Sequence, residues 1–164
     1  MTKHLLIFAR YPVLGQVKTR LAQGVGPEQA LAVYRELLAR TRAAADGLAA
    51  AKTLWLAGDP PAGPAFEDWL GYARRPQPAG DLGGRMHQAF AAAFEAGATA
   101  AVIIGTDCPD LSTDHLNTAF QQLASHDVVV GPALDGGYYL LGLRALVPDF
   151  FINKPWSTAA VLAA

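Results

Sequence analysis

The stretch IIGTDCPDL, residues 103–111, starts as an apolar strand and ends in two carboxylates, Asp107 and Asp110, placed around Pro109. Asp is a poor strand former and proline removes a backbone donor, so this pattern predicts the end of a strand. The residues alone allow two interpretations. The first is a capped strand end that leads into a turn. The second is a metal site at the carboxyl edge of a parallel sheet, where α/β proteins usually bind ligands.

Outside this stretch, apolar runs alternate with segments of helical periodicity. Strands are expected at residues 5–9, 53–57, 72–75, 100–105, 127–130 and 138–143, and helices at residues 27–45, 66–70, 82–96 and 113–124. This alternation favours an α/β fold with a mostly parallel sheet that is covered on both faces. A length of 164 residues suits one domain, residues 1–164, with a substantial core.

The composition excludes several classes of protein. The chain is 52% hydrophobic and 16% charged, which is typical of a globular protein. Its net charge of −1 argues against nucleic-acid binding, and its apolar runs are too short to span a membrane. Cys108 is the only cysteine, so an intrachain disulfide and a cysteine-based zinc site are excluded. The N-terminus has no signal-peptide pattern, and we expect a cytoplasmic protein.

The loop after the first expected strand is rich in cations. The segment ARYPVLGQVKTRLA, residues 9–22, holds Arg10, Lys18 and Arg20 close to Gly15. A glycine-containing loop with cations, set between a strand and a helix, can bind phosphate groups through backbone N–H groups and side-chain charge. The alternative is a solvated basic loop without a ligand.

Two further loops contain glycines. The segment RPQPAGDLGGRMHQA, residues 75–89, places Gly80 and Gly83 before a helix, where they would let a ligand approach the backbone. The alternative there is a flexible entry into the helix. The segment GPALDGGYYLLGL, residues 131–143, contains Asp135-Gly136-Gly137, an ordinary hairpin-turn signal. If the sheet is parallel, the segments that follow its strands gather at one edge.

Five motifs together resemble a known family. They are FARYPVLGQVKTRL, GDLGGRM, IIGTDCPDL, GPALDGGYYLLGL and WST, in the order in which they occur in a bacterial glycosyltransferase-A-like family first defined as a domain of unknown function. That family is part of the nucleotide-diphospho-sugar transferase superfamily and is similar to the guanylyltransferases that activate phospholactate in coenzyme F420 biosynthesis. The resemblance covers residues 5–158. It implies a Rossmann-like three-layer α/β/α fold that binds a nucleoside diphosphate sugar or a nucleoside triphosphate with a divalent metal, Mg²⁺ or Mn²⁺.

The resemblance also implies roles for individual residues. Together with the loop pattern, it gives as expected nucleotide-binding residues Arg10, Gly15, Lys18, Arg20, Gln77, Gly80, Leu82 and Gly83. Within this set, Lys18 and Arg20 match cationic phosphate-loop positions, and the segment from Gln77 to Gly83 resembles one that faces the nucleobase. Asp107 matches the metal-binding aspartate. The acceptor side is implied to be Asp135, Gly136 and Gly137. The expected catalytic residues are Lys18 and Arg20, whose positive charge would stabilise the leaving diphosphate, and Asp135, a candidate base for the acceptor.

Three functions fit these motifs. We expect a glycosyltransferase that uses a nucleoside diphosphate sugar and a small-molecule acceptor. The first loop lacks the G-x-G-x-R-M pattern of typical sugar nucleotidyltransferases, which argues against simple nucleotidyl transfer to a sugar phosphate. The alternatives are nucleotidyl transfer to a small phosphorylated acid and a nucleotide-binding module without catalysis. Members of the family usually continue beyond WST, so the sequence indicates a shortened C-terminus.

Overall fold

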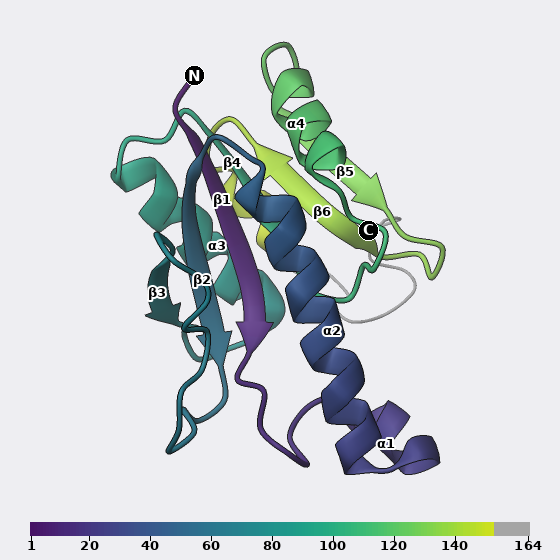
Figure 1. The fold of residues 1–164 in the computed structure, drawn as a ribbon. Coiled ribbons are helices and arrows are strands. Elements are labelled where there is room, and N and C mark those ends of the chain that lie inside the picture. Colours follow the sequence, from purple (N-terminus) through teal and green to yellow (C-terminus); the bar gives the residue numbers. More distant parts are fainter. Residues whose placement is uncertain (153–164) are drawn as a thin grey trace.

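The computed structural model describes residues 1–152, which form a twisted sheet with helices on both faces (Figure 1). In chain order the elements are β1 (Lys3–Arg10), α1 (Thr19–Val25), α2 (Pro27–Asp46), β2 (Ala51–Ala57), β3 (Ala73–Pro76), α3 (Leu82–Glu95), β4 (Ala100–Ile104), α4 (Thr113–Gln122), β5 (Val128–Pro132), β6 (Tyr138–Leu143) and the short 3₁₀-helix η1 (Pro148–Phe151). Among these residues no helix is both long and apolar enough to cross a bilayer.

The sheet has the strand order β3-β2-β1-β4-β6-β5. β1 pairs in parallel with β2 on one side and with β4 on the other, and β3 extends the parallel part beyond β2. β6 is antiparallel to both of its neighbours, β4 and β5. The predicted mostly parallel sheet is therefore confirmed. β4 lies near the centre and is buried along its whole length, as its continuous apolar run predicts.

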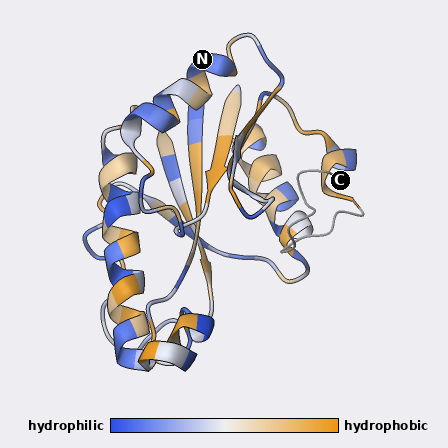
Figure 2. Cartoon of the chain, turned by 90° about the vertical axis from the view of Figure 1, so that its right-hand side faces the viewer, coloured by the Kyte–Doolittle hydropathy of each residue, from blue (hydrophilic) through white to orange (hydrophobic). Residues whose placement is uncertain are grey.

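The two faces of the sheet carry separate halves of the core. Leu5 and Ile7 of β1 pack with α2 and α4 on one face. Leu6 of β1 and Ile103 of β4 pack with α3 and Phe151 on the other face. Figure 2 shows the sheet nearly edge-on between α2 and α3. Side chains alternate along a strand, so this division gives the three-layer α/β/α arrangement.

The sequence predicts every strand of the sheet to within a few residues, but one expected helix is wrong. Residues 66–70 form turns, with Phe66 in the left-handed region at φ 58°. The ring of Trp69 packs edge-on against Phe66 at 5.7 Å and against Tyr72 at 5.0 Å between centroids. Five residues make too few intrahelical hydrogen bonds to form a stable helix alone, so these aromatic contacts decide the local conformation.

Helix α1 is an element that the sequence does not reveal. None of its residues is buried, so no apolar periodicity marks it. It packs on α2 at the edge of the molecule (Figure 1). The WST motif at residues 156–158 lies outside the residues that the structure describes.

Candidate functional site

Four loops meet at one edge of the sheet. The loops after β1, β3 and β4 leave the carboxyl ends of parallel strands, which lie at the same edge. β6 runs the other way, and its Leu140 pairs with Ile104 at the end of β4. The turn between β5 and β6 therefore reaches the same edge. The segments that the sequence singles out are thus brought to one side of the molecule by the topology.

The centre of this edge is the switch point between β1 and β4. From β1 the chain continues outward through β2 and β3, and it then returns to the other side of β1 as β4. β1 pairs with β2 as far as Arg10, but with β4 only as far as Ile7. β4 ends at Ile104, the partner of Ile7, so β1 continues to Arg10 without this neighbour. Such a point is where open α/β sheets form a crevice for ligands.

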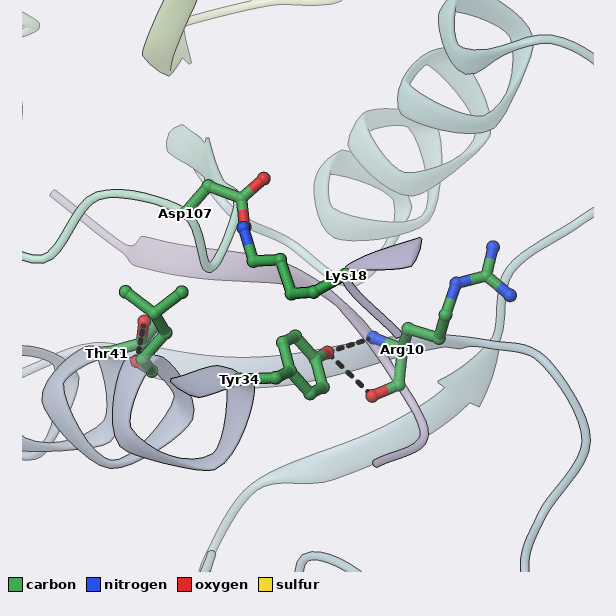
Figure 3. A network of polar contacts seen from close by, with 6 residues as sticks. Arg10, Lys18, Tyr34, Thr41 and Asp107 are labelled. Carbon is green, nitrogen blue, oxygen red and sulfur yellow. Dashed lines mark hydrogen bonds and ion pairs between the residues drawn. The ribbon is translucent and has the colours of Figure 1, made fainter. Parts of the chain in front are cut away.

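Tyr34 of α2 forms hydrogen bonds with the end of β1, where β4 no longer pairs with this strand. Its hydroxyl donates to the carbonyl of Arg10 and accepts from the Arg10 amide, each at 2.7 Å (Figure 3). Burial raises the pKa of the Tyr34 phenol above its usual range, and the Asp107 carboxylate adds to that rise. In the sequence, the helical spacing of Leu31, Tyr34 and Leu38 indicates only that Tyr34 is a core residue, so its bond to the strand end is not apparent.

Lys18 and Asp107 form an ion pair across this switch point. The Lys18 ammonium lies 2.7 Å from Oδ1 of Asp107, joining the loop after β1 to the loop after β4 (Figure 3). The side chain of Lys18 is 27% exposed and that of Asp107 is 76% exposed. An ion pair this open to solvent contributes little to stability, so both charges remain available to a ligand.

The backbone at Lys18 is unusual. Lys18 precedes the first residue of α1 and has φ 49° and ψ 45°, in the left-handed region. A residue other than glycine, asparagine or aspartate is uncommon there, and such conformations cluster at functional sites. The hydrogen bond from the Gln16 amide to the Val13 carbonyl closes a turn whose third residue, Gly15, has φ 79°. A left-handed third residue of this kind favours glycine.

The other two cations of the first loop are exposed. Arg20 is exposed in the first turn of α1. The Arg10 side chain is exposed and runs past Gly58 at the end of β2, where a Cβ would lie 3.4 Å from Nη1. Of Arg10, Lys18 and Arg20, it is Lys18 that the structure joins to the loop after β4 by an ion pair.

The donor chemistry at Asp107 fits a divalent cation that is shared with a substrate. In the described part of the chain, no group of three or more His, Cys, Asp or Glu side chains could hold a metal ion alone. Mg²⁺ is commonly bound through one or two carboxylates together with substrate phosphates. Asp107 can supply one such carboxylate, and a bound nucleotide would supply the other oxygens.

The loop after β3 is well anchored. The Gln77 side chain donates to the carbonyls of Ala9 and Trp55, at 3.2 and 3.0 Å. Asp81 caps α3, its carboxylate accepting from the Gly84 amide at 2.8 Å. Gly83 lies buried in the first turn of this helix, next to the exposed Leu82.

The turn between β5 and β6 has the geometry of a short hairpin loop. The Ala133 amide donates to the Gly137 carbonyl at 2.9 Å, and Gly136 has φ 87°. The exposed Asp135 carboxylate accepts from the Gly137 amide at 3.0 Å. The hairpin interpretation of this segment is confirmed. The acceptor-side and catalytic roles of Asp135 stay predictions.

Comparison with known proteins agrees with the fold. Residues 39–158 match a family model described as uncharacterized protein conserved in bacteria, DUF2064. The chain belongs to the DUF2064 family. A provisionally named nucleotide-diphospho-sugar transferase from Desulfovibrio desulfuricans G20 is 34% identical to this DUF2064 member, with a TM-score of 0.88 over 99% of this chain and 73% of that one. A comparison with curated proteins gives no match.

Two other solved structures are more distant from this DUF2064 member. A 2-C-methyl-D-erythritol 4-phosphate cytidylyltransferase from Thermus thermophilus is 17% identical, with a TM-score of 0.47 over 92% of this chain and 72% of that one. A CMP:2-keto-3-deoxy-manno-octonic acid synthetase in complex with CTP is 14% identical, with a TM-score of 0.47 over 98% and 81%. Likenesses this weak carry no further argument.

Proposed function

We propose that this DUF2064 protein is a metal-assisted glycosyltransferase that moves a sugar from a nucleoside diphosphate to a small acceptor. The observation that carries the proposal is the solvent-open pair of Lys18 and Asp107 at the switch point of the sheet. A diphosphate needs positive charge beside it, and a cation bridging that diphosphate needs a carboxylate. The name of the Desulfovibrio relative, a nucleotide-diphospho-sugar transferase, supports the same class of reaction.

In the proposed reaction the bond between the anomeric carbon and the diphosphate oxygen breaks, and the diphosphate leaves with the electron pair. The acceptor hydroxyl forms the new bond, and its proton passes to the Asp135 carboxylate. Lys18 exchanges its partner Asp107 for a phosphate oxygen, and Arg20 adds a second positive charge. A divalent cation bound by Asp107 and the phosphates would supply Lewis-acid stabilisation of the leaving group.

Nucleotidyl transfer to a small phosphorylated acid is the second candidate. The motif resemblance to phospholactate guanylyltransferases supports it, as do three cations, Arg10, Lys18 and Arg20, around one loop. In that reaction a substrate phosphate attacks the α-phosphorus and pyrophosphate leaves, so the same cations would serve a more highly charged group.

A thermal-shift screen tests the nucleotide site first. Nucleoside diphosphates, diphosphate sugars and triphosphates are each added with Mn²⁺, with Mg²⁺ or with a chelator. A ligand that binds only the folded state raises the melting temperature by mass action. The proposal expects the largest metal-dependent shift from a diphosphate or a diphosphate sugar, and it fails if no nucleotide stabilises the protein.

Product analysis then separates the two reactions. Release of a nucleoside diphosphate from a diphosphate sugar in the presence of an acceptor supports glycosyl transfer. Release of pyrophosphate from a triphosphate and a phosphorylated acid supports nucleotidyl transfer. Tight binding without turnover of either donor identifies a nucleotide-binding module instead.

A further inference from the structure

The side chain of Gln77 is fully engaged as a donor within the protein. Its amide nitrogen carries two hydrogens, and it donates to two backbone carbonyls, those of Ala9 in β1 and Trp55 in β2. Both carbonyls lie near the carboxyl ends of their strands. The Gln77 backbone amide also donates to the carbonyl of Leu56, at 2.9 Å. Gln77 therefore fixes the start of the loop to the edge of the sheet.

Arg85 fixes the same loop from the other side. It lies in the first turn of α3, and its Nη1 donates to Oε1 of Gln77 at 3.2 Å. Its Nε donates to the carbonyl of Gly80 at 3.0 Å. Gly80 has φ 112°, a conformation that favours glycine. One guanidinium thus holds both Gln77 and Gly80 in the loop between β3 and α3, residues 77–81.

The partners of Gln77 determine which way its amide points. Two of them are carbonyl oxygens, which only accept, and the third is a guanidinium, which only donates. A flipped amide would place its oxygen against the carbonyls of Ala9 and Trp55 and its NH₂ against Arg85. Only the orientation described here forms all three bonds, so both Gln77 donors must be directed at the sheet.

We infer that Gln77 and Arg85 are positioning residues and that Gln77 does not read the base itself. Together their side chains form a brace, which holds the backbone of residues 78–81 in place for the nucleobase. This inference rests on the proposed nucleotide site. Gln77 would have to break a bond to the sheet before it could donate to a base edge, and its Oε1 already accepts from the Arg85 guanidinium. Base selectivity therefore belongs to the backbone of residues 78–81 and its neighbours. This differs from the role that the family resemblance implies for Gln77.

The test uses the whole chain and the variants Gln77→Met, Arg85→Met and Arg85→Lys. Methionine keeps an unbranched apolar stem and removes the polar end, and lysine keeps one donor and the charge but not the rigid fork. Arg40→Met is the matched control, because Arg40 pairs at the surface with Glu36, four residues away on α2. Affinity for the diphosphates of adenosine, guanosine, cytidine and uridine is measured for each variant by calorimetry.

The brace predicts that both methionine variants weaken binding of all four diphosphates by a similar factor, about tenfold, as expected for lost hydrogen bonds to a charged group. The order of preference among the bases stays unchanged. Arg85→Lys recovers part of the loss, and Arg40→Met binds like the parent. A change in base preference for Gln77→Met, with Arg85→Met unaffected, would mean that Gln77 reads the base.

Amide hydrogen exchange tests the brace without any ligand. The amide of residue 77, at the start of the loop, donates to the Leu56 carbonyl, and the amide of residue 84, in α3, donates to the carboxylate of Asp81, the last residue of the loop. The Val102 amide, in β4, reports on the core. In Gln77→Met and Arg85→Met the exchange at 77 and 84 should be about tenfold faster, with Val102 unchanged. Faster exchange at Val102 would mean that the methionine variant is destabilised as a whole. The exchange at residues 77 and 84 is then compared between the parent and Arg85→Lys.

Unchanged exchange at residues 77 and 84 in a folded variant would overturn the brace. If the parent binds none of the four diphosphates, the proposed function fails, but the exchange measurement still decides whether Gln77 and Arg85 hold the loop. The two failures are therefore distinguishable.

Discussion

The loop after β1 and the loop after β3 reach the same edge of the sheet, but they are fixed in different ways. The first is joined to the loop after β4 through a solvent-open ion pair between Lys18 and Asp107. In the second, Gln77 binds two strand ends, and Arg85 of α3 binds Gly80 within the loop. The first is held by charge and the second by directed hydrogen bonds.

This difference suits two parts of one nucleotide ligand. Charges that face solvent can exchange one partner for another at little cost, as binding of phosphates and a cation requires. A backbone that recognises the shape of a base must already be in place, because ordering a loop on binding reduces affinity. We therefore expect substitutions in the first region to affect charge-dependent binding and turnover, and substitutions in the second to affect the binding of all nucleotides alike.

The largest effect is expected from Asp107→Asn. The substitution keeps the shape of the side chain and removes its charge. Stabilisation of a leaving diphosphate by a metal is worth several kcal/mol, so turnover should fall by roughly two to four orders of magnitude. Initial rates with a diphosphate sugar check this. Asp110→Asn is the control, since Asp110 is an exposed carboxylate three residues away, and it should change the rate far less.

The next effect is expected from Lys18→Ala. Loss of a charged donor should weaken binding of a nucleoside diphosphate by about tenfold to a hundredfold and leave binding of the bare nucleoside unchanged. Calorimetry with both ligands checks the prediction. Equal losses for the two ligands would place the phosphates elsewhere. Lys18→Gly sharpens the comparison, because glycine adopts the left-handed conformation at φ 49° without strain. This variant should have a higher free energy of unfolding, while its binding of diphosphate still falls.

A smaller effect, on stability, is expected from Tyr34→Phe. The substitution leaves the Arg10 amide and carbonyl without their partner beside β1. These two hydrogen bonds are part-buried, and a hydrogen bond contributes about 0.5–1.5 kcal/mol net, so the free energy of unfolding should fall by about 1–3 kcal/mol. Urea denaturation measures it. Tyr139→Phe, at a half-buried tyrosine of β6, should cost less. Equal stability of the parent and Tyr34→Phe would mean that water can replace the tyrosine hydroxyl as the hydrogen-bond partner of the Arg10 backbone.

The smallest effect is expected at His4, outside both regions. Its Nε2 lies 2.8 Å from the Thr53 hydroxyl, and burial, aided by the positive charge of Arg75, lowers the pKa of His4. The folded state thus favours the neutral ring. Its contribution to stability should be complete above about pH 6.5, the ordinary histidine pKa, and should be lost as pH falls toward the lowered folded pKa. In His4→Gln the free energy of unfolding should depend less on pH between pH 7 and pH 5 than it does in the parent. The same pH dependence in both proteins would contradict this.

Much of the fold follows from local sequence patterns. The continuous apolar run of residues 100–104 predicts a buried central strand, and the four-residue spacing of Met86, Phe90 and Phe94 predicts the helix that covers it. The position of β6 between β4 and β5 does not follow, because strand pairing joins residues far apart in the chain. Helix α1 and the turns at 66–70 also escape prediction. The first has no buried face, and the second depends on aromatic contacts formed only in the folded protein.

The candidate site is predictable as residues but not as contacts. The sequence identifies Lys18 and Asp107 separately, yet 89 positions separate them and only the parallel topology brings them together. It marks Tyr34 as a core residue through helical spacing, which says nothing about its hydroxyl. Gln77 is a further case, since its side chain is directed by the carbonyls of two neighbouring strands that no local pattern reveals.

The central claim, that Asp107 binds a cation together with a nucleotide at the switch point, is tested most directly by the effect of Mn²⁺ on diphosphate affinity. The nucleoside diphosphate preferred by the parent is titrated into the parent and into Asp107→Asn, each with and without Mn²⁺. In the parent, Mn²⁺ should tighten binding by about tenfold or more, as a cation shared between carboxylate and phosphates does. In Asp107→Asn the metal should have no effect, and metal-free binding should equal or exceed that of the parent because Lys18 is then free to meet the phosphates. An undiminished effect of Mn²⁺ in Asp107→Asn would contradict the assignment and leave Asp107 as a strand-end residue paired with Lys18.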